Sequence, residues 1–199
     1  GFAPIDPAPI GLTEDFPIEW LREAKARESR LVGRWTFDDL HGDLVRDESG
    51  ARRHGKASGV ARVEGRMGKA LRFQGKGSGV ALDSVIAALP REASQRTICG
   101  WFEAAPRTGP IFFEYGEDRP GGRFAIAASG TELSVDVGGH RIGRDDLALS
   151  GWTHLAAVVP PGAARSDRIF LFLDGKPVET RTLSGEPTAL DTGSQTAGI

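Results

Sequence analysis

From residue 31 onward, the hydrophobic positions come in short runs that end in clusters of Gly, Asp, Ser and Pro. Within the runs the pattern is apolar or alternates with a period of two, which is typical of β-strands with a buried face. It predicts about eight strands, at residues 31–37, 68–73, 98–102, 111–115, 123–127, 133–137, 154–159 and 169–173. No helical pattern of 10–15 residues separates the runs, so the strands must pair mostly antiparallel. We therefore expect an all-β fold in which two antiparallel sheets pack as a β-sandwich.

One turn of this fold is legible in detail. Asp174 and Gly175 stand between two β-prone runs, and Asp-Gly supplies the two positive-φ positions that a type I′ hairpin needs. Pro177 follows two residues after Gly175 and cannot donate a hydrogen bond to a neighbouring strand. We expect a tight hairpin whose return strand is short or lies at a sheet edge.

The first 30 residues differ from the rest of the chain. Pro4, Pro7, Pro9 and Pro17 interrupt a segment with little periodicity, which is typical of an extended linker. Residues 18–27 then favour a short helix of mixed charge. The start at Gly1 resembles a cut fragment or a mature terminus. The domain prediction is therefore a linker with a short helix at 1–30 and a sandwich at 31–199.

Composition narrows the function classes. With 39% hydrophobic and 26% charged residues the chain is that of a globular protein, and 27 glycines fit many tight turns. A net charge of -2 gives no general attraction to nucleic acid. The sequence contains no run of 18 apolar residues, so we expect no membrane insertion. Cys99 is the single cysteine, so no internal disulfide can form, and its apolar surroundings predict a buried structural thiol.

Four motifs occur in an order that resembles the laminin-G-like jelly-roll family of concanavalin A-like domains. The first is LVGRWTFD at 31–38, which is similar to the opening strand of the family, and the second is DESG at 47–50 followed by His54-Gly55. The third, GRMGKALRFQG at 65–75, is close to "G-x-x-G-x-A-L-x-F-x-G". The fourth pairs WTHLA at 152–156 with LFLDGK at 171–176. The resemblance implies the sandwich fold, whereas function depends on sites that vary among such domains.

The resemblance also implies a closing strand that is hard to place in this chain. Members of the family usually end with a strand similar to "G-x-I-D-E-V-R-I-Y", which pairs near the opening strand. This sequence ends at Gly198-Ile199, about where the preceding strand would lie. We therefore expect a sandwich that lacks its closing strand, with residues 1–30 as one candidate to fill the place.

An acidic loop is the best candidate for a metal site. Carboxylates and backbone carbonyls that gather in one loop are the oxygen ligands that calcium prefers. The loop contains Asp38, Asp39, Asp43, Asp47, Glu48 and Ser49. Related jelly rolls often hold calcium here, and the resemblance assigns Asp38, Asp47 and Ser49 as ligands. The alternative is a turn whose Asp and Ser side chains bond nearby backbone N–H groups, with Arg46, Arg52 and Arg53 balancing the charge.

Aromatic side chains are the candidates for sugar binding, because they can stack on sugar rings. Trp35, Trp101 and Trp152 lie within strand patterns and are expected in the core. Trp20 and Tyr115 remain as candidates for the surface, and Tyr115 is the predicted ligand-binding residue.

The sequence contains no motif that indicates catalysis. Glycosidases of this fold commonly carry E-x-D-x-E on one strand, which is absent from the sequence. Glu132 and Asp136 would share one strand face, but a solvated outer face explains them equally well. The four histidines, His41, His54, His140 and His154, form no zinc-binding pattern.

The sequence thus predicts a non-catalytic binding module for carbohydrate, part of a larger extracellular or periplasmic bacterial protein. Its expected partners are a carbohydrate or protein ligand and other domains of the same parent chain. The alternative is a structural or protein-interaction domain without a small ligand, which the scarcity of predicted exposed aromatics favours. A glycosidase or polysaccharide lyase is the third and weakest interpretation.

Overall fold

The computed structural model of the protein describes residues 31–82, 88–104, 111–193 and 197–199. Across these residues the fold is all-β, with a short 3-10 turn, η2, at Ser166–Arg168. Every strand pairing within them is antiparallel. The prediction of an antiparallel all-β sandwich is confirmed. The linker and helix predicted at 1–30 lie outside the described residues.

The larger of the two main sheets has ten strands in the order β1-β2-β3-β6-β16-β8-β9-β10-β11-β15. Their bounds are Leu40–His41 (β1), Leu44–Val45 (β2), Gly55–Ser58 (β3), Gly79–Ala81 (β6), Ala197–Gly198 (β16), Ile111–Gly116 (β8), Arg123–Ala128 (β9), Leu133–Val137 (β10), His140–Arg144 (β11) and Arg181–Ser184 (β15).

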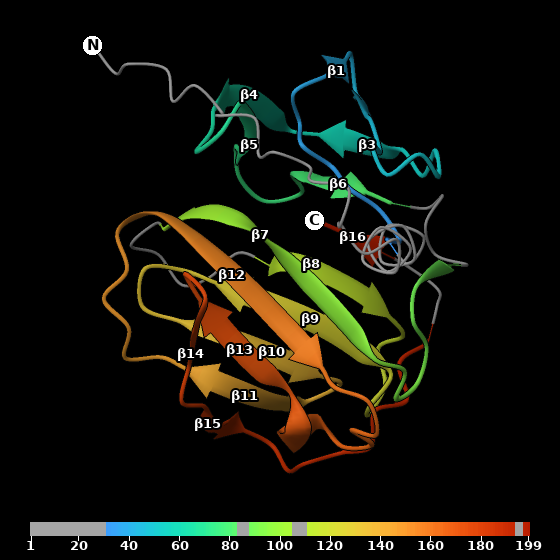
Figure 1. The fold of residues 1–199 in the computed structure, drawn as a ribbon, viewed down its shortest axis with the longest axis vertical. Coiled ribbons are helices and arrows are strands. Elements are labelled where there is room, and N and C mark those ends of the chain that lie inside the picture. Colours follow the sequence, from blue (N-terminus) through green and yellow to red (C-terminus); the bar gives the residue numbers. More distant parts are fainter. Residues whose placement is uncertain (1–30, 83–87, 105–110, 194–196) are drawn as a thin grey trace, which may run out of the picture.

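The second main sheet has four strands in the order β14-β13-β12-β7, and a separate hairpin pairs β4 with β5. The bounds are Lys176–Pro177 (β14), Phe170–Leu173 (β13), Gly151–Val159 (β12), Arg96–Ala104 (β7), Val60–Glu64 (β4) and Lys69–Phe73 (β5). Figure 1 shows the four-stranded sheet in front of strands β8 to β11, with the β4–β5 hairpin above it.

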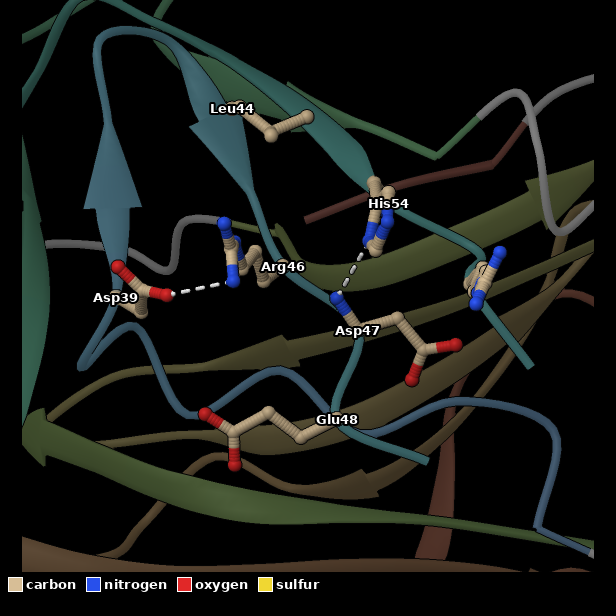
Figure 2. Close-up of a pocket in the computed structure, with 7 residues that line it drawn as sticks. Asp39, Leu44, Arg46, Asp47, Glu48 and His54 are labelled. Carbon is tan, nitrogen blue, oxygen red and sulfur yellow. Dashed lines mark hydrogen bonds and ion pairs between the residues drawn. The ribbon is translucent and has the colours of Figure 1, made fainter. Parts of the chain in front are cut away.

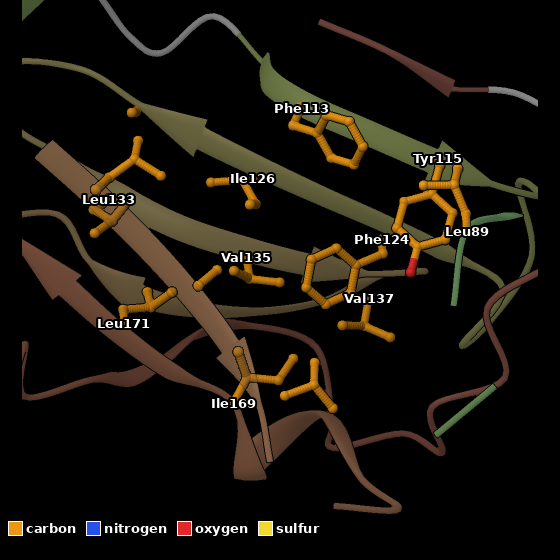
Figure 3. Packing of buried hydrophobic residues seen from close by; sticks show 14 of the residues in the cluster. Leu89, Phe113, Tyr115, Phe124, Ile126, Leu133, Val135, Val137, Ile169 and Leu171 are labelled. Carbon is orange, nitrogen blue, oxygen red and sulfur yellow. The ribbon is translucent and has the colours of Figure 1, made fainter. Parts of the chain in front are cut away.

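The core lies between these two sheets, and its side chains come from both (Figure 3). β12 shows how the sequence builds it, because burial alternates residue by residue along the strand. The fully buried residues of the two sheets include Phe124, Ile126, Leu133, Val135, Val137, Leu155, Ala157 and Leu171. Since alternate residues point to opposite faces, the same strand also presents a second row of side chains to solvent.

The predicted hairpin is confirmed. Asp174 and Gly175 both have positive φ, at 47° and 77°, as a type I′ turn requires. Pro177 lies in β14, a two-residue strand at the edge of the four-stranded sheet.

The strand predicted at 31–37 is wrong. These residues are held by side chains instead of a sheet partner: the Trp35 Nε1–H donates to the Arg53 carbonyl at 3.0 Å, and the Arg34 N–H donates to Asp47 at 2.9 Å. The other seven predicted runs each contain or overlap a strand of the fold.

The end of the chain lies inside the larger sheet. β16 lies between β6 and β8, and Ile199 exchanges backbone hydrogen bonds of 2.8 and 3.0 Å with Val80. The prediction that residues 1–30 take the place of a closing strand stays a prediction.

Candidate functional site

The acidic loop is organised around the carboxylate of Asp47, which is only 6% exposed. Its Oδ1 accepts hydrogen bonds from the backbone N–H of Arg34 at 2.9 Å and of Ser49 at 2.8 Å. Its Oδ2 accepts from the Ser49 hydroxyl at 2.8 Å and from the Arg53 N–H at 2.9 Å. A carboxylate offers about four lone-pair sites, so Asp47 is fully occupied by the protein itself.

The ionisation of Asp47 follows from these contacts. Burial acts to raise the pKa of the carboxyl, but the hydrogen bonds from Arg34, Ser49 and Arg53 outweigh it and hold the pKa below the ordinary 3.8. The carboxylate is therefore charged at neutral pH, where it fastens three segments of the loop. This arrangement is the turn that the sequence offered as the alternative to a calcium site.

Asp38, the other carboxylate predicted to bind calcium, contacts the backbone of β5. Its Oδ1 accepts the backbone N–H of Lys69 at 2.7 Å, which ties the loop to β5. Asp39 pairs with Arg46 at 3.1 Å and Asp43 with Lys56 at 3.4 Å. Within the described residues no group of three or more His, Cys, Asp or Glu side chains could hold a metal ion.

An open depression of about 510 Å³ lies beside this loop (Figure 2). Side chains of both charge signs surround it, and Arg46 bridges to Asp39 across its wall. The lining residues are Asp39, Leu44, Arg46, Asp47, Glu48, Arg52 and His54. Since Asp47 is occupied and Glu48 accepts the Thr36 hydroxyl at 2.6 Å, the depression presents no convergent set of unused ligands.

Calcium addition tests the loop directly. We expect millimolar CaCl₂, compared with EDTA, to leave the melting temperature unchanged, because an ion at Asp47 would have to displace four donors. Differential scanning fluorimetry of the wild-type protein measures this. A calcium-dependent rise of several degrees that Asp47→Ala abolishes would restore the calcium prediction for Asp38, Asp47 and Ser49.

The prediction that Tyr115 is a surface aromatic is wrong, because its side chain is 1% exposed in the core. Its hydroxyl donates to the Pro90 carbonyl at 2.8 Å, and the Arg96 guanidinium lies 5.7 Å from its ring centroid. Burial raises the pKa of Tyr115 to about 12, although Arg96 acts in the opposite direction. Figure 3 shows the ring packed beside Phe124. Tyr115 therefore offers no surface for a sugar.

The outer face of the four-stranded sheet carries two exposed aromatics instead, Trp101 and Phe170. The register of β7, β12 and β13 places the side chains of alternate residues of each strand on this face. Trp101 is 39% exposed and Phe170 is 55% exposed, so the expectation of a core position for Trp101 is wrong. Cys99 is exposed here too, contrary to the predicted buried thiol. The row comprises Thr97, Cys99, Trp101, Glu103, Trp152, His154, Ala156, Val158, Phe170 and Phe172.

Trp101 is held in place from two sides. It pairs with His154 across β7 and β12, and the two rings meet edge to face with centroids 5.3 Å apart. From the turn of the β4–β5 hairpin, the guanidinium of Arg66 lies 5.5 Å from the Trp101 ring centroid. The neighbouring Met67 is 71% exposed. Together these residues form an aromatic and cationic surface, here called the Trp101 platform: Arg66, Trp101 and His154.

Glu132, Glu114 and Asp136 are engaged in ion pairs or hydrogen bonds. Glu132 pairs with Arg141 and accepts the Ser134 hydroxyl at 2.5 Å, and Glu114 pairs with Arg123. Asp136 accepts the Gly139 N–H at 3.1 Å, within the turn between β10 and β11.

The histidines likewise serve separate contacts. His140 is buried between the hydroxyls of Ser166 at 2.6 Å and Thr182 at 3.3 Å, and its burial lowers its pKa. His54 accepts the Asp47 N–H at 3.1 Å.

No family model matches this chain, and no curated protein is significantly similar to it. The laminin-G-like resemblance therefore depends on the four quoted motifs and stays a prediction. Among the described residues, no helix is long and apolar enough to cross a membrane.

Proposed function

We propose that the protein is a non-catalytic carbohydrate-binding module whose binding surface is the Trp101 platform. The observation that carries the proposal is the Trp101 ring, which is exposed on the outer face of a sheet although indole rings are favoured in cores. Flat aromatic rings stack on the apolar faces of sugars, and a ring fixed by its neighbours loses little entropy on binding. His154 and Arg66 provide that fixation.

The position of the ring on a strand supports the same function. Trp101 lies in β7, a nine-residue strand paired along its whole length with β12. A site on a rigid strand holds its geometry better than one on a loop. The setting that we propose is extracellular or periplasmic, where a module attached to a larger protein meets polysaccharides.

Trp101→Ala tests the proposal. Loss of the stacking surface is expected to weaken glycan binding at least about tenfold, because an aromatic contact with its buried area contributes on the order of 1.5 kcal/mol or more. Binding is measured by a glycan array followed by titration calorimetry with the best ligand.

The control for this variant is Phe73→Ala. Phe73 is 40% exposed, close to the exposure of Trp101, but lies in β5 outside the four-stranded sheet. We expect Phe73→Ala to bind as the wild type does. No glycan binding by the wild-type protein, or equal binding by Trp101→Ala, would refute the proposal.

A protein-interaction domain is the second candidate, and Phe170 favours it. This side chain is 55% exposed opposite Val158 at the far end of the same sheet face, and Phe172 lies beside Ala156. Exposed apolar side chains grouped on one face are typical of protein contacts. Under this function a specific protein partner would be lost on Phe170→Ala and retained on Trp101→Ala.

A further inference from the structure

Arg66 is a cation without an ion pair among the described residues. It lies in the turn between β4 and β5, and its contact there is the Trp101 ring, 5.5 Å from the guanidinium to the ring centroid. Of the other charged side chains of the hairpin, Lys69 pairs with Glu64, Arg62 donates to the Asp38 carbonyl, and Arg72 is exposed in β5. Arg66 is the cation of the hairpin that contacts the platform ring.

None of the other charged groups near the platform forms an ion pair with Arg66 among the described residues. His154 contacts the Trp101 ring, and its backbone N–H donates at 2.9 Å to Asp174, whose carboxylate thereby ties the β13–β14 turn to β12. Glu103 lies on the same sheet face, opposite Trp152 and two residues from Trp101 along β7. It forms no ion pair with Arg66, so the guanidinium keeps its hydrogen-bond donors for a ligand.

We infer that the ligand of the Trp101 platform is an anionic glycan that carries a carboxylate, a uronic acid, and that Arg66 binds this carboxylate. The inference rests on the proposed function and adds the class of sugar. A guanidinium is planar and presents paired N–H donors that match the two oxygens of a carboxylate. The guanidinium lies over the Trp101 ring, which stays 39% exposed, so one pyranose unit can pack on the exposed part of the ring while its carboxylate meets the cation.

The chemistry of the site distinguishes this ligand from a neutral sugar. A neutral hexose would leave the charge of Arg66 without compensation, whereas a uronate neutralises it through a charge-assisted hydrogen bond. Such an exposed ion pair is screened by salt, so uronate binding must weaken as ionic strength rises.

The test compares acidic polysaccharides with forms of the same polysaccharides whose carboxylate charge is removed. Polygalacturonate, alginate and hyaluronate are each titrated into the full chain beside their carboxyl methyl esters, with a set of neutral glucans and galactans as a further arm. A sulfated galactan identifies an anion preference that does not require a carboxylate. Titrations are run at 50 mM and 500 mM NaCl.

Two variants of the protein are compared with the wild type. Arg66→Gln removes the charge but keeps a side chain of similar length. Arg72 is an exposed arginine of β5, and Arg72→Gln changes the net charge by the same amount.

We expect at least one uronate to bind about tenfold more tightly than its methyl ester at 50 mM NaCl, with the difference reduced at 500 mM. Arg66→Gln should bring acid and ester to the same affinity, whereas Arg72→Gln should leave the preference intact. Melting curves confirm that both variants are folded.

The following outcomes would overturn the inference. Equal binding of acid and ester, or binding of neutral glycans alone, would refute the uronate and leave the carbohydrate module standing. Equal effects of Arg66→Gln and Arg72→Gln would remove Arg66 from the site. A preference for the sulfated galactan over every uronate would replace the carboxylate by a sulfate. Absence of all glycan binding would refute the proposed function itself.

Discussion

Gly138→Ala is expected to destabilise the protein by about 3 kcal/mol, and Gly139→Ala by about 1 kcal/mol. Both glycines have positive φ in the turn between β10 and β11, at 53° and 103°. A Cβ at Gly138 would lie 2.2 Å from the Arg119 carbonyl oxygen and 2.4 Å from the Gly121 nitrogen. A Cβ at Gly139 would meet no atom within 4 Å. The steric clash is therefore confined to Gly138.

Gly138→Ala and Gly139→Ala separate the cost of backbone strain from the cost of a steric clash, two costs that usually occur together. A side chain at φ near 53° is tolerated better than one at 103°, because the first value is close to the left-handed helical region. Backbone strain alone would thus make Gly139→Ala the worse variant. Packing reverses the order, since Arg119 and Gly121 belong to a backbone loop that cannot rotate away. Urea unfolding of the two variants measures the difference, and equal losses would contradict the close approach of these loops.

Asp47→Ala is expected to cost about 3 kcal/mol at pH 7. The substitution removes an acceptor that is 6% exposed and leaves the N–H groups of Arg34, Ser49 and Arg53 without it. Hydrogen bonds to a charged group contribute about 1.5–3 kcal/mol each, and orphaned donors add a desolvation cost, although the loop relaxes partly. Asp43→Ala is the control, because its ion pair with Lys56 is exposed and contributes on the order of 0.5 kcal/mol.

The same carboxylate makes the stability depend on pH. The pKa of Asp47 is lower in the folded protein than its ordinary 3.8, so the unfolded chain takes up the proton first as pH falls. Its contribution is fully present above the ordinary pKa and is lost as pH falls through the lower folded pKa. The stability gap between wild type and Asp47→Ala should therefore be constant from pH 7 to about 5 and shrink below 3.8. Urea unfolding at several pH values measures it, and a gap that stays constant down to pH 2 would contradict the role of the charge.

Alternation predicted the strands well but the buried face only in part. At 111–115, Phe113 and Tyr115 share one face while Glu114 lies on the other, so the sequence did contain a signal that Tyr115 points inward. At 98–102 the signal is absent. Ile98 and Phe102 lie on one face and Cys99 and Trp101 on the other, and both faces are apolar. Which face meets the second sheet depends on tertiary packing.

The acidic loop shows another limit of prediction from the sequence, which is that distant contacts leave no local pattern. Contacts between Asp47 and Ser49 are local, and the sequence offered such a turn as one alternative. The contact with Arg34 spans 13 residues and has no local pattern. Likewise, nothing in the turn sequence at Arg66 indicates that its side chain reaches Trp101 in another sheet. Long-range contacts of this kind decide both sites, and the contact of Asp38 with the Lys69 N–H, which spans 31 residues, is another.

The β4–β5 hairpin pairs with no other strand among the described residues. The aromatic ring and the cation of the Trp101 platform thus lie on separate structural units, the four-stranded sheet and a two-stranded hairpin. Exchange of the two exposed turn residues, Arg66 and Met67, would leave the hydrophobic core of the sandwich untouched. Under the proposed function, ligand preference in this scaffold could therefore diverge, or be redesigned, at little cost in stability, with affinity retained by Trp101 and selectivity changed in the turn.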